Sequence, residues 1–298
     1  MALLNPPELR ASMMSIIVLY LAQRRGQREE WTRIVDAITP PTLTDSPHEH
    51  QRDARRNLRS AIEIGIASRD GDLVQLSPES TNAAKAGTLA IARLLRQRVL
   101  SEGLNTAPWG SQVGARDLTN ALAWFLTFAP TKAPVRMEGD PPSAQTLQEA
   151  DFGKRHGDDA SGWPISNAER WRAFQRWACS LGFAWRSPSR RLVPDPTPAV
   201  RDSIPAIFGS ETTLDGRSFV TTLGIHVPVL DRGAYREFVE QNWNRSSGSG
   251  MTLSAATTHA LQRLNKSGHL EIQDRADARR ETLADGSTFS HVSRGRIR

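Results

Sequence analysis

Residues 57–77 read NLRSAIEIGIASRDGDLVQLS, and this stretch decides how the rest of the chain is interpreted. It ends a segment in which apolar residues recur at helical spacing. These residues form one stripe, made of Ala54, Leu58, Ala61 and Ile62. Gly65 suits the left-handed residue that ends a helix, and Asp70-Gly71 between alternating residues is a strong hairpin signal. The stretch therefore predicts a helix that ends near Ile64, followed by a two-stranded β-hairpin.

Two shorter helical stretches precede this one. The first, within ASMMSIIVLYLAQRR, has apolar residues at helical spacing, namely Met13, Ile16, Ile17, Tyr20 and Leu21. The second, REEWTRIVDAI, gathers apolar residues on one face and ends at TPPTLTDSP. Three helices followed by a two-stranded wing is the order of a winged helix-turn-helix, which we expect over residues 1–82.

Cruder versions of the same order follow, so we predict a mainly α protein with short β-hairpin wings, built from tandem winged helix-turn-helix modules. Residues 83–129 are expected to form a helical pair packed on the first module, with Leu89, Ala92, Leu95 and Val99 inward. Residues 130–165 lack a sustained period, which favours a loop or linker. Residues 166–203 predict a helix and a winged-helix-like hairpin. Residues 204–298 predict a C-terminal winged helix-turn-helix with one helix after Pro228 and a basic tail.

Composition favours an arginine-rich surface. The chain has 298 residues and a net charge of +6, and lysine occurs only four times, so arginine supplies 34 of the 38 basic residues. Arginine forks bind phosphate well, which suits nucleic acid. A GC-rich genome that favours arginine codons explains the same bias equally well.

The cysteine count and the apolar segment near the start of the sequence indicate the cellular compartment. A single cysteine, Cys179, excludes an intramolecular disulfide and a cysteine-based zinc cluster, and it fits the cytoplasm. The apolar segment Met13–Ala22 is too short to span a bilayer, so we expect no membrane contact. It has the length of a signal-peptide core, but no small-residue cleavage site follows it, and a buried first helix is favoured.

The most informative feature is an arginine stripe on the third predicted helix. Its members lie on a face apart from the apolar stripe and are Arg52, Arg55, Arg56 and Arg59. The third helix of a winged helix-turn-helix enters the major groove, where arginine reaches phosphates and guanine edges. Glu63 neutralises part of this face. A solvated basic face and a site for an acidic protein are the alternatives.

Other basic residues are weaker candidates for nucleic-acid contact. Arg69 precedes the predicted hairpin tip. In the last module the residues expected to point outward are Thr258, Gln262, Arg263 and Lys266. The basic tail contains Arg294, Arg296 and Arg298, for which a solvated tail is the alternative. Aromatic residues can stack on bases, but Trp171, Trp177 and Trp185 at this spacing favour a core.

The sequence lacks the common motifs of nucleotide-dependent and hydrolytic enzymes. It contains no phosphate-binding loop, dinucleotide fingerprint or nucleophile elbow. His48 and His50 lack the spacing that places two imidazoles on one metal ion. The acidic residues Glu149, Asp151, Asp158 and Asp159 keep a magnesium-dependent nuclease open as a minor alternative. We therefore expect no enzyme activity, no cofactor and no metal.

The start MALLNPPELRASMMSIIVLYLAQR, together with the length and layout of the chain, resembles the G component of the bacterial Dpd systems. Those defence clusters insert deazaguanine bases into DNA and restrict unmodified DNA. The resemblance implies an accessory role beside helicase and nuclease subunits, and it supplies no catalytic residue to transfer.

Two hypotheses follow. The first is a non-catalytic subunit that binds duplex DNA through winged-helix modules in an anti-phage restriction system. The second is a docking scaffold within a multi-subunit defence complex, whose basic charge is incidental. The sequence does not indicate an oligomeric state.

Overall fold

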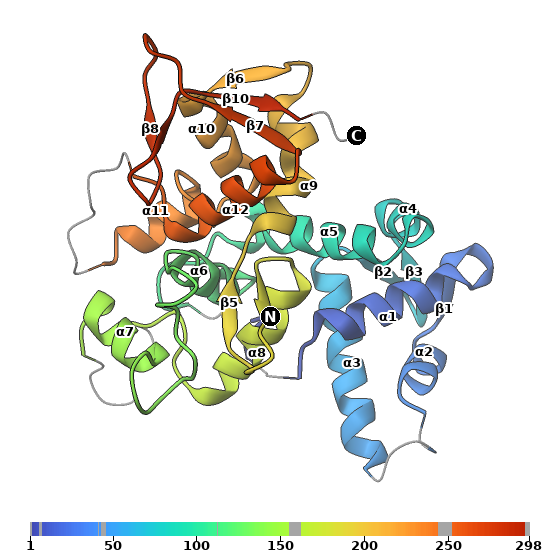
Figure 1. The fold of residues 1–298 in the computed structure, drawn as a ribbon. Coiled ribbons are helices and arrows are strands. Elements are labelled where there is room, and N and C mark those ends of the chain that lie inside the picture. Colours follow the sequence, from blue (N-terminus) through green and yellow to red (C-terminus); the bar gives the residue numbers. More distant parts are fainter. Residues whose placement is uncertain are drawn as a thin grey trace. The chain divides into compact units, whose positions relative to one another are not determined.

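The computed structural model describes residues 2–5, 8–40, 42, 46–111, 113–154, 162–243 and 252–295. Within these residues the protein is mainly helical with small antiparallel sheets, which confirms the predicted mainly α class with short hairpins (Figure 1). The chain forms two compact units, Met1–Leu118 with Arg172–Leu181, and Thr119–Trp171 with Gly182–Arg298. Two of the three boundaries fall inside helices α6 (Arg116–Phe125) and α8 (Ala168–Ser180), and the third follows the end of α8.

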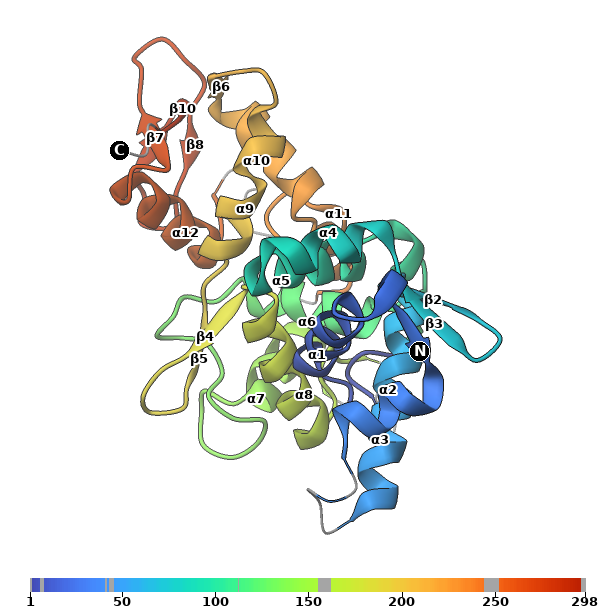
Figure 2. The ribbon, with the colours of Figure 1, turned by 90° about the vertical axis from the view of Figure 1, so that its right-hand side faces the viewer.

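The first unit opens with helices and strands that alternate around one sheet. Its elements are α1 (Ala11–Ala22), the 3₁₀ helix η1 (Arg25–Gln27), β1 (Arg28–Glu30), α2 (Trp31–Ile38), α3 (Pro47–Glu63), β2 (Ala67–Asp70) and β3 (Leu73–Leu76). Neighbouring strands are antiparallel, and β3 lies between β1 and β2. The predicted hairpin is present, with Asp70 paired to Leu73. Figure 2 shows this hairpin projecting from the helices of its unit.

Helix α3 forms where the apolar stripe predicts it. Ala54, Leu58 and Ala61 are fully buried. The helix ends in a Schellman motif, in which the Gly65 amide donates to the Ile62 carbonyl and the Ile66 amide to the Ala61 carbonyl. Gly65 has a φ of 76°, a conformation that disfavours other residues. The local signals in residues 57–77 therefore specify both the end of the helix and the hairpin.

Helix α1 buries a different face from the expected one. Its buried residues are Ala11, Met14, Ile17, Val18 and Leu21, and Ile16 is 47% exposed. A helix that is apolar on nearly all sides does not identify its inner face, because several stripes satisfy the same spacing. Packing against α2 and α3, and against the two helices that follow the hairpin, makes the choice.

The first helix of the pair expected over residues 83–129 is itself two helices, α4 (Pro78–Ala86) and α5 (Thr88–Val99). They separate at Gly87, which has a φ of 98°. Leu89 lies in the first turn of α5 and is 76% exposed, so its expected inward position is wrong. The buried face of α5 runs through Ile91, Leu94, Leu95 and Val99, and Leu89 projects away from it at about 100° per residue. A 3₁₀ helix, η3 (Glu102–Leu104), follows.

The stretch expected as a loop or linker contains helix α7 (Ala144–Phe152). Ser143 and Thr146 form a reciprocal capping box at its start. The Gln148 side chain exchanges hydrogen bonds with the backbone of Ile165, and the Trp124 indole donates to Asp151. These buried polar contacts organise a segment that lacks an apolar period, which is why the sequence did not indicate a helix here.

The second unit continues with a two-stranded hairpin and then a second alternation. The elements are β4 (Ala184–Arg186), β5 (Leu192–Pro194), α9 (Thr197–Phe208), β6 (Thr213–Asp215), α10 (Gly216–His226), α11 (Ala234–Glu240), α12 (Ala255–Lys266), β7 (Leu270–Gln273), β8 (Glu281–Thr282), β9 (Thr288–Phe289) and β10 (His291–Arg294). In its three-stranded sheet β10 lies between β6 and β7. The sequence predicted α11, α12 and the returning strand, but not α9 or α10.

The two three-stranded sheets are built in the same order. In each sheet one edge strand precedes a set of helices. The last of these helices leads into a hairpin, and the second long strand of that hairpin lies at the centre of the sheet. In the second sheet the hairpin carries an extra pair of short strands, β8 and β9, between β7 and β10.

Candidate nucleic-acid interface

Helix α3 presents arginine on the side away from its buried stripe. Arg52, Arg55 and Arg59 are exposed. Arg56 is half-buried, and its guanidinium lies 3.5 Å from the Glu8 carboxylate. Three of the four predicted positions are therefore open to solvent, whereas the fourth is an ion-pair partner of the N-terminal segment.

Asn57 holds this segment against α3. It is 1% exposed, accepts a hydrogen bond from the Arg10 amide at 2.9 Å, and donates to the carbonyls of Glu8 and Asp53. A buried amide that meets three backbone groups fixes both segments. Sequence reasoning missed Asn57, because an asparagine inside an amphipathic helix gives no local signal of a distant partner.

The carboxylates of Glu8 and Asp53 lie at one edge of the arginine-bearing face of α3. Burial and the neighbouring Glu8 charge raise the pKa of Asp53, while Arg52, Arg56 and Arg10 act in the opposite direction. One oxygen of each carboxylate, Glu8 and Asp53, is buried without a hydrogen-bond partner. The exposed arginines thus border an acidic pair at one edge of the helix.

Arg69 is held on the hairpin by its own neighbours. Its Nε donates to the Gly71 carbonyl at 2.7 Å, and its Nη2 lies 3.3 Å from the Asp72 carboxylate. The guanidinium stacks over the Trp31 ring at 4.5 Å from the centroid. The side chain is therefore pre-positioned beside the hairpin tip and keeps an exposed face.

In the second unit the outward face of α12 is partly covered. Thr258, expected to point outward, is 3% exposed, and its hydroxyl accepts a hydrogen bond from the Ala284 amide. Gln262 donates to the Asp285 carboxylate at 2.7 Å. The β8–β9 hairpin folds back over the helix, and this return was not predicted because the polar residues of the hairpin resemble a loop.

The remaining basic positions on α12 differ in their surroundings. Arg263 is exposed but forms an ion pair with Asp195, which precedes α9. Lys266 is exposed at the end of the helix. Only part of the predicted face of α12 is therefore open to a ligand.

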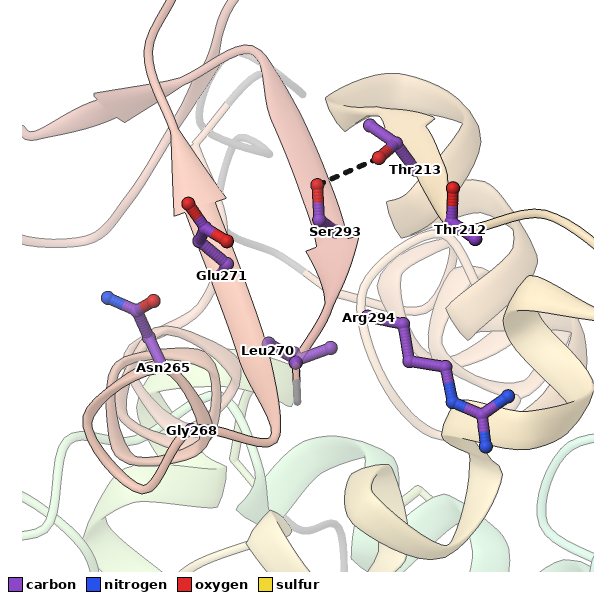
Figure 3. Close-up of a pocket in the computed structure, with 9 residues that line it drawn as sticks. Thr212, Thr213, Asn265, Gly268, Leu270, Glu271, Ser293 and Arg294 are labelled. Carbon is purple, nitrogen blue, oxygen red and sulfur yellow. Dashed lines mark hydrogen bonds between the residues drawn. The ribbon is translucent and has the colours of Figure 1, made fainter. Parts of the chain in front are cut away.

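Arg294 borders a polar concavity of about 820 Å³ at the end of the second sheet. Figure 3 shows Glu271 and Asn265 on one side, Arg294 on the other, and Leu270 between them. The Thr213 and Ser293 hydroxyls lie 2.8 Å apart. A Cβ on Gly295 would lie 2.0 Å from the Gly268 carbonyl, so this close approach needs glycine. The mixed charges do not select an anion. Arg296 and Arg298 lie outside the described residues.

The structure describes only some of the residues that the sequence suggested as metal ligands. In the described part of the chain, no group of three or more histidine, cysteine, aspartate or glutamate side chains could hold a metal ion. His50 bonds through its ring to the Ser46 carbonyl, and buried Asp151 accepts from Trp124. Asp158 and Asp159 lie outside the described residues.

The three tryptophans do not share one environment. Trp171 and Trp177 are buried, which confirms the core expectation for them. Trp185 is 45% exposed on β4, so that expectation is wrong for this residue. Trp185 follows the end of α8 on a strand, where helical spacing no longer describes which side chains face inward.

The fold and the arginine positions define a mainly α protein with two similar small sheets and basic helix surfaces. The chain belongs to the DpdG-like family, whose model matches residues 1–278. Membership implies a role in the Dpd defence system, as the resemblance indicated. Comparisons with curated proteins and with solved structures found no match. None of the described helices is long and apolar enough to cross a membrane.

Proposed function

We propose that the protein is a non-catalytic subunit of the Dpd anti-phage restriction system that binds duplex DNA through winged-helix modules. Support for the first module comes from its element order, α1, β1, α2, α3, β2 and β3, with β3 central. The second module rests on a similar order from α9 to β10, with one more helix before the hairpin and the β8–β9 pair inserted between β7 and the central strand β10. In such modules the third helix lies in the major groove and the hairpin touches the backbone or the minor groove.

The observation that carries this proposal is the set of exposed arginines on α3, together with Arg69 on the hairpin that follows this helix. Arg52, Arg55 and Arg59 occupy one helix face, which matches a duplex backbone in charge. Arg69 is held rigidly and keeps an exposed face, so little side-chain entropy is lost when it meets a phosphate. In the proposed complex α3 lies in a groove and the hairpin meets the flanking phosphates.

The two modules contribute unequally in this proposal. The β8–β9 hairpin occupies part of the face of α12, which leaves less room for a groove. The second module then supplies phosphate contacts from Lys266 and Arg294 rather than base contacts. Helicase and nuclease subunits of the same system are the protein partners that we propose.

Fluorescence anisotropy with labelled duplex DNA at several salt concentrations tests the first module. Arg55→Ala with Arg59→Ala is expected to weaken binding and to reduce the slope of log K against log salt by about 2, because two phosphate contacts are lost. Arg93→Ala with Arg172→Ala removes the same charge from exposed positions on α5 and α8 of the same unit. This control is expected to keep most of the slope. Equal losses in both double variants would refute an interface on α3.

A docking scaffold is the second candidate function. Exposed Ile16 on α1 and Leu89 on α5 favour it, because an exposed apolar side chain is more useful to a protein partner than to DNA. Two results together would support the scaffold. Other subunits would co-purify stably after nuclease treatment, and the Arg55→Ala/Arg59→Ala variant would recover these subunits as well as the wild type does. Loss of all partners on nuclease digestion would contradict it.

A further inference from the structure

The β4–β5 hairpin combines an exposed aromatic residue with a basic loop. Trp185 is half-exposed and pairs with Val193 across the hairpin. Arg186, Arg190 and Arg191 lie within the next six residues, and no acidic residue occurs between Arg186 and Pro194. Figure 2 shows the loop of this hairpin projecting beyond its strands. Aromatic and arginine side chains together are the two elements of single-strand binding surfaces.

The loop is tightly closed. Ser187 exchanges backbone hydrogen bonds with Arg191 and Arg190: its amide donates to the Arg191 carbonyl, and its carbonyl accepts from the Arg190 amide. The Ser187 hydroxyl accepts from the Arg191 amide and lies 2.9 Å from the Ser189 hydroxyl. Arg191 also donates to the Thr131 carbonyl at 3.4 Å. The basic side chains therefore start from a fixed backbone.

Arg190 adopts the left-handed conformation, with a φ of 61°. Three-residue hairpin loops place glycine or asparagine at this position, because a side chain there costs about 1 kcal/mol or more. An arginine in a position that favours glycine reduces stability without adding a contact to the core. Strain of this kind at an exposed tip indicates a role for the side chain itself.

We propose that this hairpin binds single-stranded nucleic acid, with Trp185 stacking on one base while Arg186 and Arg190 contact the adjoining phosphates. In a duplex the faces of the bases are already stacked, so the nucleic-acid group that an exposed indole can stack on is an unpaired base. The site lies on elements separate from α3 and the β2–β3 hairpin, and it does not depend on the proposed duplex contact.

Anisotropy with labelled oligothymidine, which lacks secondary structure, tests the hairpin in the full-length chain. Trp185→Ala is expected to weaken binding roughly 5- to 150-fold, the range for loss of one base stacked on an aromatic side chain. Trp185→Phe keeps an aromatic face and is expected to retain most of the affinity. Unchanged affinity in Trp185→Ala, or failure of the wild-type protein to bind oligothymidine, would overturn the proposal.

Arg190→Gly separates binding from folding. Glycine suits the left-handed position, so Tm is expected to stay equal or to rise while oligothymidine affinity falls. Arg190→Lys, which keeps the charge, is expected to bind more tightly than Arg190→Gly. Duplex affinity should remain near the wild-type value in both, whereas Arg55→Ala with Arg59→Ala should show the reverse pattern. Wild-type oligothymidine affinity in Arg190→Gly would count against the site even if the duplex interface holds.

Discussion

At the scale of single residues, the buried side chain of Asn57 links the N-terminal segment to α3 through hydrogen bonds with the Arg10 amide and the Glu8 carbonyl, and it also donates to the Asp53 carbonyl within α3. Asn57→Ala leaves the Arg10 amide and the Glu8 carbonyl without this partner, so we expect about 2–4 kcal/mol of destabilisation. Gln51→Ala is the matched control, because this amide on the same helix makes an exposed hydrogen bond to Asp36. Urea unfolding followed by circular dichroism measures both. If both variants lost a similarly small part of the free energy of unfolding, Asn57 would not anchor the N-terminal segment.

Two aspartates are expected to respond to pH with opposite signs. Burial and Glu8 raise the pKa of Asp53, so the folded state binds its proton more tightly than the unfolded state. The stability contributed by this proton is present in acid and is lost as pH rises through the folded pKa. Asp53→Asn should therefore raise Tm at neutral pH and match the wild type below the unfolded pKa.

Asp215 provides the opposite case. Hydrogen bonds from the side chain and backbone of Ser218, at the start of α10, lower the pKa of Asp215. Its contribution is present above the unfolded pKa and is lost as pH falls through the folded pKa. Asp215→Asn keeps the capping oxygen but removes the charge, so Tm should fall at neutral pH and converge with the wild type in acid. Shifts of the same sign in Asp53→Asn and Asp215→Asn would refute this assignment.

At the scale of elements, the β8–β9 hairpin and α12 form one packed pair. Thr258→Val has nearly the same shape but cannot accept the Ala284 amide, and it leaves that donor unpaired. We expect hydrogen exchange in residues 282–286 to accelerate at least about tenfold, since a loss near 1.4 kcal/mol corresponds to that factor. His259→Ala, at an exposed position on the same helix, should leave exchange unchanged. Wild-type protection in Thr258→Val would show that the hairpin is held by other contacts.

At the scale of the whole molecule, the first unit is completed by a segment distant in sequence. The buried guanidinium of Arg96 donates to the Leu181 carbonyl at 2.9 Å, and both residues belong to that unit. A fragment of residues 1–118 lacks this partner and the apolar side chains of α8. We expect it to bind a hydrophobic dye and to unfold with low cooperativity, unlike the full-length chain. A sharp thermal transition in the fragment would show that residues 1–118 fold alone.

Several features could be predicted because their causes are local. Helix α3, its glycine end and the Asp-Gly hairpin depend on residues within a few positions of one another. The exposed arginines follow from the same helical period. The inner face of α1 and helix α7 could not be predicted, because apolar residues on every side or a lack of period leave the choice to distant contacts. The break at Gly87 has a local cause, but a single glycine inside a helical pattern is also tolerated, so the residue alone does not decide between a break and a continuous helix.

The sequence by itself determined the mainly α class, the family, and the arginine-bearing helix followed by a hairpin, because spacing, turn chemistry and the match to the family are properties of the chain order. Only the tertiary structure decided which surfaces remain open. It buries Thr258 beneath the β8–β9 hairpin, pairs Arg263 with Asp195 and leaves Trp185 exposed. The physical reason is that exposure depends on segments that pack together from distant positions, and no local pattern encodes that pairing.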